Sequence, residues 1–102
     1  MKVHWTDHAR QQLRAIHAYI ADDAPVYADQ VVDELTDRFH QLGNFPHSGR
    51  KVPEYDAADI REVIIAPYRI VYRIKSDQID VLSVLHGAQE VPMDLVDGDD
   101  GE

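Results

Sequence analysis

The sequence predicts an α+β fold in which a short N-terminal strand and an antiparallel two-helix hairpin precede, and pack on, an antiparallel β-meander. Two long apolar patterns of helical period fill the first half of the chain, and three short segments rich in β-branched residues fill the second. The 102 residues, 44% of them apolar, suffice for one compact core but not for two. We therefore expect one domain over residues 1–92, followed by an acidic, disordered tail over 93–102.

The first half of the chain predicts one strand and two helices. Residues 2–5 alternate polar and apolar side chains, and Thr6 follows as the N-cap of a helix over residues 7–21. Pro25, acceptable in a first helical turn, opens a second helix that ends at Gly43. The short link makes the two helices an antiparallel hairpin. The buried helical faces consist of Ala9, Leu13, Ile16 and Ile20, then Ala28, Val31, Val32, Leu35, Phe39 and Leu42.

The second half of the chain begins with a long connection and continues as three strands. Residues 43–59 have no sustained period, so we expect an ordered loop there. Loops of this length inside compact domains are often functional. Beyond it, the length and β-branched content of three segments predict a meander. The predicted strands are Ile60–Ile65, Tyr68–Lys75 and Gln78–His86.

The last two predicted strands form a hairpin whose register decides which side chains share a face. If Lys75–Gln78 is the loop, Ile74 lies opposite Ile79 and the pairing continues outward from there. The face expected to pack on the helices then holds Tyr68, Ile70, Tyr72 and Ile74 beside Leu85, Ser83, Val81 and Ile79. We expect the two tyrosines to be core residues rather than catalytic phenols.

The opposite, outer face of this hairpin carries charged side chains. Arg73 stands opposite Asp80, and we expect a cross-strand ion pair between them. Arg69 stands opposite Val84 with His86 on the diagonal, so Arg69 and His86 should share this face. A guanidinium among apolar neighbours presents a fixed fork of donors, suited to a carboxylate or a phosphate. Arg69 is therefore the strongest functional candidate, and His86 either joins it in function or only closes the sheet edge.

Composition and charge exclude several classes of protein. The net charge is −9, and only residues 43–75, with six basic against four acidic side chains, are net positive. This argues against direct DNA binding, which needs a clustered positive field. There is no cysteine, and His4 and His8 straddle a strand–helix junction with no further ligand nearby. We expect no metal, no cofactor and no membrane segment, and hence a cytoplasmic protein.

An ordered set of short motifs runs through the chain from residue 3 to residue 92. It comprises Trp5-Thr6, Ala9, Leu13, Ile16, Tyr19-Ile20, Ala28, Leu42, Pro46, Gly49-Arg50, Val52-Pro53-Glu54, Ile60-Arg61-Glu62, Tyr68-Arg69-Ile70, Tyr72-Arg73-Ile74 and Val84-Leu85-His86. This set resembles the ParE/RelE superfamily of toxins from bacterial type II toxin-antitoxin modules. The resemblance implies a helical hairpin packed on an antiparallel sheet, in agreement with the patterns above.

The superfamily contains RelE-like members, which are ribosome-dependent mRNA endonucleases. One alternative for this chain is therefore an enzyme that would use Arg69 and His86, with help from Tyr72 or Arg61, on mRNA in the ribosome. Metal-free cleavage of this kind needs a base, a cation for the phosphate and an acid for the leaving oxygen.

The chain departs from the RelE-like pattern at three positions. Glu62 stands where the resemblance implies a lysine. Gln89 and Pro92 stand near where it implies an arginine and a tyrosine. The set of nuclease residues is therefore incomplete.

ParE-like members of the superfamily bind DNA gyrase, and the chain resembles them more closely in its long hairpin and its Gly49-Arg50 loop. The resemblance implies a toxin that inhibits gyrase and is neutralised by a cognate antitoxin, whose segment orders across the toxin. The residues expected to contact target or antitoxin are Arg50, Arg61, Arg69, Arg73 and His86. A third interpretation is an inactive relic that still binds an antitoxin.

Overall fold

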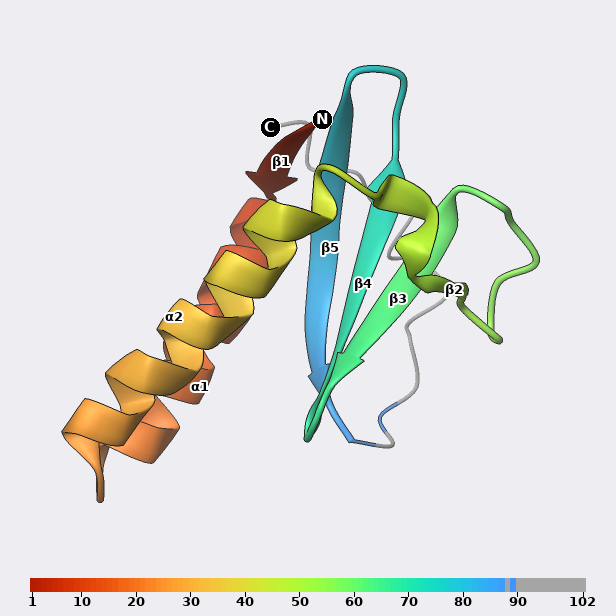
Figure 1. The fold of residues 1–102 in the computed structure, drawn as a ribbon. Helices are drawn as coiled ribbons and strands as arrows, with labels where there is room; N and C mark the ends of the chain where they lie inside the picture. The colour runs from red at the N-terminus through yellow and green to blue at the C-terminus, as the bar shows by residue number, and fades with distance from the viewer. Residues whose placement is uncertain (88, 90–102) are drawn as a thin grey trace.

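The computed structural model describes residues 1–87 and 89, which form a layer of two helices beside a sheet (Figure 1). The elements are β1 (Lys2–Trp5), α1 (Asp7–Ala21), α2 (Pro25–Leu42), the 3₁₀ turn η1 (Pro46–Ser48), β2 (Arg50–Lys51), β3 (Ile60–Ile65), β4 (Tyr68–Ile74) and β5 (Gln78–His86). None of the described helices has the length and apolarity needed to cross a membrane. The tail expected over residues 93–102 lies outside the described part of the chain.

The sheet has five strands in the order β1-β5-β4-β3-β2. The strand β1 runs parallel to β5, and the other neighbours are antiparallel. The predicted α+β fold, with an N-terminal strand, a helical hairpin and a meander from β3 to β5, is confirmed. The sequence patterns did not indicate that β1 joins the sheet beside the last strand, or that the long connection contains η1 and β2.

The first helix begins at its predicted cap, which also ties it to the sheet. Thr6 Oγ1 accepts a hydrogen bond from the backbone N–H of Ala9 (3.2 Å) and donates one to the carbonyl of Val81 on β5 (2.8 Å). Pro25 occupies the first turn of α2, where its missing N–H would have no helical partner in any case. The predicted ends of both helices are confirmed.

The helical hairpin covers one face of the sheet and buries the main apolar core there (Figure 1). The rings of Trp5, Phe39 and Tyr72 meet edge to face, with centroids 5.8 and 5.6 Å apart. The buried members of this core are Ala9, Leu13, Leu35, Phe39, Leu42, Ile65, Tyr68, Ile70, Tyr72, Ile79, Val81 and Val84. Tyr68 and Tyr72 are thus core residues, as predicted. The free end of the hairpin, where α1 meets α2, projects beyond the sheet.

The outer face of the sheet carries a second, smaller apolar core, which the sequence did not predict. Its buried members are Val52, Ile60, Val71, Leu82 and Leu85. The loop that follows β2 covers this cluster, and Tyr55 and Ala57 pack against it. The sheet is therefore buried on both faces, and the long connection serves as the outer cover.

A β-bulge in β5 alters the predicted register of the last hairpin. Three pairs near the turn are as predicted, namely Ile74 with Ile79, Arg73 with Asp80 and Tyr72 with Val81. Beyond them Val71 pairs with Ser83, which leaves Leu82 as an extra residue on β5. Every later pair is displaced by one residue.

This displacement exchanges the faces of the last residues of β5. Val84 joins the helix-side core and Leu85 joins the outer one, the reverse of the predicted arrangement. His86 lies opposite Tyr68, and the two rings meet edge to face at 5.6 Å. The prediction that Arg69 and His86 share the outer face is therefore wrong, because one inserted residue inverts the alternation of a strand.

Candidate functional site

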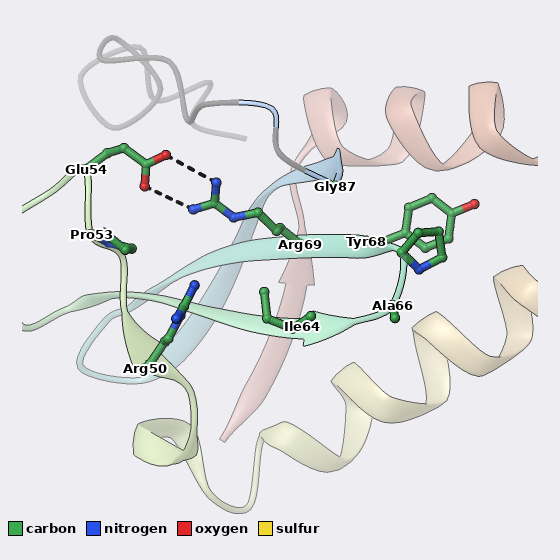
Figure 2. A pocket seen from close by; sticks show the side chains of 9 residues that line it. Arg50, Pro53, Glu54, Ile64, Ala66, Tyr68, Arg69 and Gly87 are labelled. Carbon is green, nitrogen blue, oxygen red and sulfur yellow. Dashed lines mark hydrogen bonds and ion pairs between the residues drawn. The ribbon is translucent and has the colours of Figure 1, made fainter.

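The centre of the outer face is Arg69 on β4, whose guanidinium is fully engaged by neighbouring groups. Figure 2 shows its two contacts with Glu54. The guanidinium forms two hydrogen bonds with Glu54 (3.0 and 3.2 Å) and two with Oε1 of Glu62 (2.8 and 2.6 Å). A fifth bond runs to the backbone carbonyl of Gln89 (2.9 Å). The five N–H donors of a guanidinium are thus all used, and the side chain is only 13% exposed. The hydrogen bonds to Glu54, and then to Glu62, raise the pKa of Arg69 although burial opposes them.

Glu62 on β3 is a fully buried carboxylate held between two arginines. Its side chain is 0% exposed, Oε1 accepts from Arg69, and Oε2 accepts from Nε of Arg50 at 2.6 Å. Strand alternation places Glu62 on the outer face, one diagonal step from Arg69. A buried charge is costly unless it is paired, so both arginines are needed to hold Glu62 inside the fold. We call Arg50, Glu54, Glu62 and Arg69 the outer-face network.

An open hollow of about 610 Å³ lies beside the outer-face network (Figure 2). Its apolar lining includes Ile64, Ala66 and Pro67, and the Ile64 side chain is half exposed. Arg50 lies at its edge and remains 62% exposed while its Nε holds Glu62. An apolar floor beside an accessible guanidinium suits a segment with apolar and acidic side chains.

Arg61 and Tyr72 lie on the helix side of the sheet and hold the loops on either side of β2. The Tyr72 hydroxyl donates to the carbonyl of Pro46 (2.7 Å) and accepts from the N–H of Gly49 (3.1 Å). Arg61 donates to the carbonyls of Gly49 and Ala58, both at 3.0 Å. A Cβ at Gly49 would stand 2.5 Å from Tyr72 Oη, so this close approach requires glycine. Burial is the main cause that raises the pKa of Tyr72, which is 0% exposed.

Arg73 faces outward, but its ion pair is not the predicted one. Its Nε donates to Asp59 at 3.3 Å. Both side chains are more than a third exposed, Asp59 at 47% and Arg73 at 35%. Asp80, although opposite Arg73 in the register, is buried and pairs with Lys75 (2.7 Å) and Gln78 (2.6 Å). The prediction failed because the loop before β3 brings Asp59 to Arg73, while Lys75 reaches Asp80 from the end of the same hairpin.

His86 ends β5 and is exposed on the helix side of the sheet. Its backbone N–H donates to Oε1 of Gln89 (2.8 Å), and the backbone carbonyl of Gln89 accepts from Arg69. Gln89 thus closes the end of β5 and supports the outer-face network through its main chain.

The two carboxylates of the outer-face network were missed as site residues. Glu62 was noted only as a departure from a family pattern, yet it alternates with Ile60 and Ile64 on the face that carries Arg69. A diagonal pairing of β3 with β4 would have brought these charges together. Glu54 lies in an aperiodic loop, so no local pattern placed it there.

A sequence profile identifies the family to which these features belong. The profile described as "ParE toxin of type II toxin-antitoxin system, parDE" matches residues 3–91. This chain belongs to that family. The ParE/RelE resemblance of the sequence motifs is confirmed, and the protein is a type II toxin of this superfamily.

Individual relatives of this ParE-family toxin carry both ParE and RelE names. Toxin RelE2 of Caulobacter vibrioides is 29% identical over 89 residues, covering 86% of this chain and 97% of its own. The chromosomal ParDE system of P. aeruginosa contains a chain with a TM-score of 0.73 and 21% identity, covering 85% of this chain and 96% of that one. The toxin-antitoxin complex RelBE2 of Mycobacterium tuberculosis contains a chain with a TM-score of 0.56 and 21% identity. The match covers 83% of this chain and 95% of that one. These two structures share the fold.

The sheet of this ParE-family toxin separates the residues that a nuclease would have to combine. Arg69 is on the outer face, whereas Tyr72 and Arg61 are on the helix side and His86 lies beside Tyr68. Proton transfer and phosphate stabilisation require groups that converge on the same atoms. Of the candidate residues, Arg50, Arg69 and Arg73 thus lie on the outer face, whereas Arg61, Tyr72 and His86 lie on the helix side.

Proposed function

We propose that this ParE-family toxin acts by binding and inhibiting DNA gyrase, and that a cognate antitoxin neutralises it. The observation that carries the proposal is the closed outer-face network. Arg69, which would have to stabilise a scissile phosphate in a nuclease, bonds Glu54 and Glu62 with four of its five donors. A phosphate would have to displace these carboxylates and leave Glu62 buried without one of its partners.

The remaining groups also argue against RNA cleavage. Tyr72 is buried with both functions of its hydroxyl in use, and its raised pKa makes it a poorer acid at neutral pH. Glu62 adds a negative charge beside Arg69, the cation that would have to hold the phosphate, and like charges repel. Inhibition by binding needs none of these groups to be free, so it fits the geometry better.

The antitoxin is expected at the hollow beside the outer-face network. The partner would lay apolar side chains on Ile64, Ala66 and Pro67 and bring an acidic side chain to the exposed guanidinium of Arg50. The solved relatives come from a ParDE system and from a RelBE2 toxin-antitoxin complex, which supports a protein partner of this kind. Arg61 and Arg73 would contribute less to antitoxin binding, because Arg61 holds the Gly49 loop and Arg73 is paired with Asp59.

The test is controlled expression of the chain, followed by analysis of plasmid topology and of mRNA 5′ ends. We expect growth arrest, relaxed plasmids and intact mRNA, and rescue when a candidate antitoxin encoded beside the toxin is co-expressed. Cleavage of ribosome-bound mRNA at codon spacing, with normal supercoiling, would instead establish the RelE-type activity suggested by the name of the Caulobacter relative. Normal growth together with antitoxin binding would mark an inactive relic.

A further inference from the structure

The free end of the helical hairpin concentrates exposed large apolar side chains in one short segment. Tyr19 is 83% exposed, Val26 71% and Tyr27 58%, so three of the six exposed large hydrophobic residues among those described lie within residues 19–27. Their side chains are largely open to solvent, and the end of the hairpin to which they belong projects beyond the sheet (Figure 1). We call residues 19–27 the hairpin tip. Exposed aromatic side chains that are not needed for the core are typical of protein interfaces.

The hairpin tip belongs to a longer acidic stretch of the helical hairpin. Between Arg14 and Arg38 the sequence has no lysine or arginine, but it has five aspartates and one glutamate. His17 is the one residue of this stretch that can carry a positive charge, and it bonds Asp29 at 2.7 Å. A partner for this surface must therefore be positively charged, since like charges placed across an interface oppose binding.

A hollow at the hairpin tip indicates the kind of side chain that such a partner would supply. It is lined by Ala18, Tyr19, Ile20, Asp22, Asp23 and Ala24. An exposed phenol ring beside two carboxylates is the combination that attracts an ammonium or guanidinium group, through the ring face and through charge-assisted hydrogen bonds.

We propose that the hairpin tip is the surface with which this toxin docks on its target, and that lysine or arginine side chains of the target enter the hollow beside Tyr19. The inference rests on the proposed function, because an enzyme that acts on DNA carries clustered cations to hold phosphates. Those cations are complementary to an acidic, aromatic tip.

The position of the tip leaves the antitoxin surface free. The helical hairpin and the loop that covers the outer face lie on opposite sides of the sheet (Figure 1). The outer-face hollow offers Arg50 to an acidic partner, while the tip offers carboxylates to a basic one. Two surfaces of opposite charge can thus serve two different partners.

The test measures binding of the full chain to purified DNA gyrase at two salt concentrations. One variant combines Tyr19→Ser with Tyr27→Ser, and a second combines Asp22→Asn with Asp23→Asn. The control for the tyrosines is Phe45→Ser, because Phe45 lies outside the tip and its exposure, 71%, is between those of Tyr19 and Tyr27. The control for the aspartates is Asp37→Asn, which lies on α2 outside the tip. The thermal midpoint of each variant is measured to check that it stays folded.

We expect each double variant to weaken gyrase binding about tenfold or more and the controls to change it less than about twofold. The aspartate variant should also lose most of the salt dependence seen with the wild type. Wild-type binding that the tip variants retain in full would overturn the docking assignment alone. If the wild type fails to bind gyrase, the proposed function falls, and the assignment of the tip to that target falls with it.

Discussion

The two faces of the sheet are both buried, but different forces hold their covers in place. On the helix side, twelve apolar or aromatic residues form one cluster, and its energy comes from excluded water and close packing. On the outer side five of the described apolar residues form a buried cluster, next to a fully buried carboxylate with two arginines. A packed apolar face loses stability gradually as volume is removed, whereas a buried charge network fails when a single member is lost.

The largest effect should follow from removing one partner of the buried charge. Arg69→Met leaves Glu62 in the interior with Arg50 alone, and we expect the free energy of unfolding to fall by about 3–5 kcal/mol. Urea denaturation measures this loss. The matched control is Arg69→Met combined with Glu62→Leu, which removes both charges and should recover most of it. A single variant as stable as wild type would show that the network is dispensable.

A smaller loss of stability is expected when the hydroxyl of Tyr72, which fixes the loop before β2, is removed. Tyr72→Phe leaves the carbonyl of Pro46 and the N–H of Gly49 without their partner, which costs about 1–3 kcal/mol.

The same tyrosine predicts a dependence on alkaline pH. Burial raises the pKa of Tyr72 above its ordinary value of 10.0, so its contribution is complete below pH 10.0 and is lost as the pH rises through that value toward the folded pKa. Denaturation between pH 8 and 11 should therefore show a steeper decline for the wild type than for Tyr72→Phe, at about pH 10. Parallel curves would contradict this assignment. Tyr68, whose pKa burial also raises, remains in both proteins and supplies the shared decline.

The helix face should respond only to lost volume. Ile70 is 0% exposed in the helix-side core, and Ile70→Val removes one methylene, at a cost of about 0.5–1.5 kcal/mol. The loss should be the same at pH 5 and pH 8, because no titratable group changes its surroundings. A loss that varies with pH would mean that the two faces are coupled.

The smallest change is expected at the edge of the outer face. Asp59→Asn removes the exposed partner of Arg73, and such pairs contribute about 0–1 kcal/mol. High salt should abolish even this difference in urea denaturation. A loss comparable with that of Arg69→Met would show that the charge network extends along the whole of β4.

The contrast between the faces also explains which features the sequence could predict. The helices and the strands β3 to β5 follow from apolar periods that depend on local spacing alone. The bulge at Leu82 does not, because residues 81–85 are nearly all apolar and both faces of β5 are buried, so no alternation marks the extra residue. Arg69 was identified as the central residue of the outer face from its apolar neighbours.

The partners of Arg69 depended on contacts between distant segments. Glu62 reaches it across a strand pair, and Glu54 reaches it from a loop whose path is set by Val52 entering the outer core. A cation expected to be open to a ligand is thus closed by the protein's own carboxylates. The sequence patterns did not indicate the hairpin tip. Only their exposure in the folded protein distinguishes Tyr19 and Tyr27 from aromatic residues of the core.

The central claim is that the outer-face network occupies the guanidinium of Arg69, so that it cannot bind a phosphate. The most direct test of this claim is the solvent exchange of the Arg69 Nε proton, measured by NMR on the folded wild-type protein. Arg38, on the exposed face of α2, is the internal reference. Because Nε of Arg69 bonds the buried Glu62 at 2.8 Å, its proton should exchange at least about tenfold more slowly than that of Arg38. Equal exchange rates would show a guanidinium open to solvent and to a phosphate, and would contradict the account.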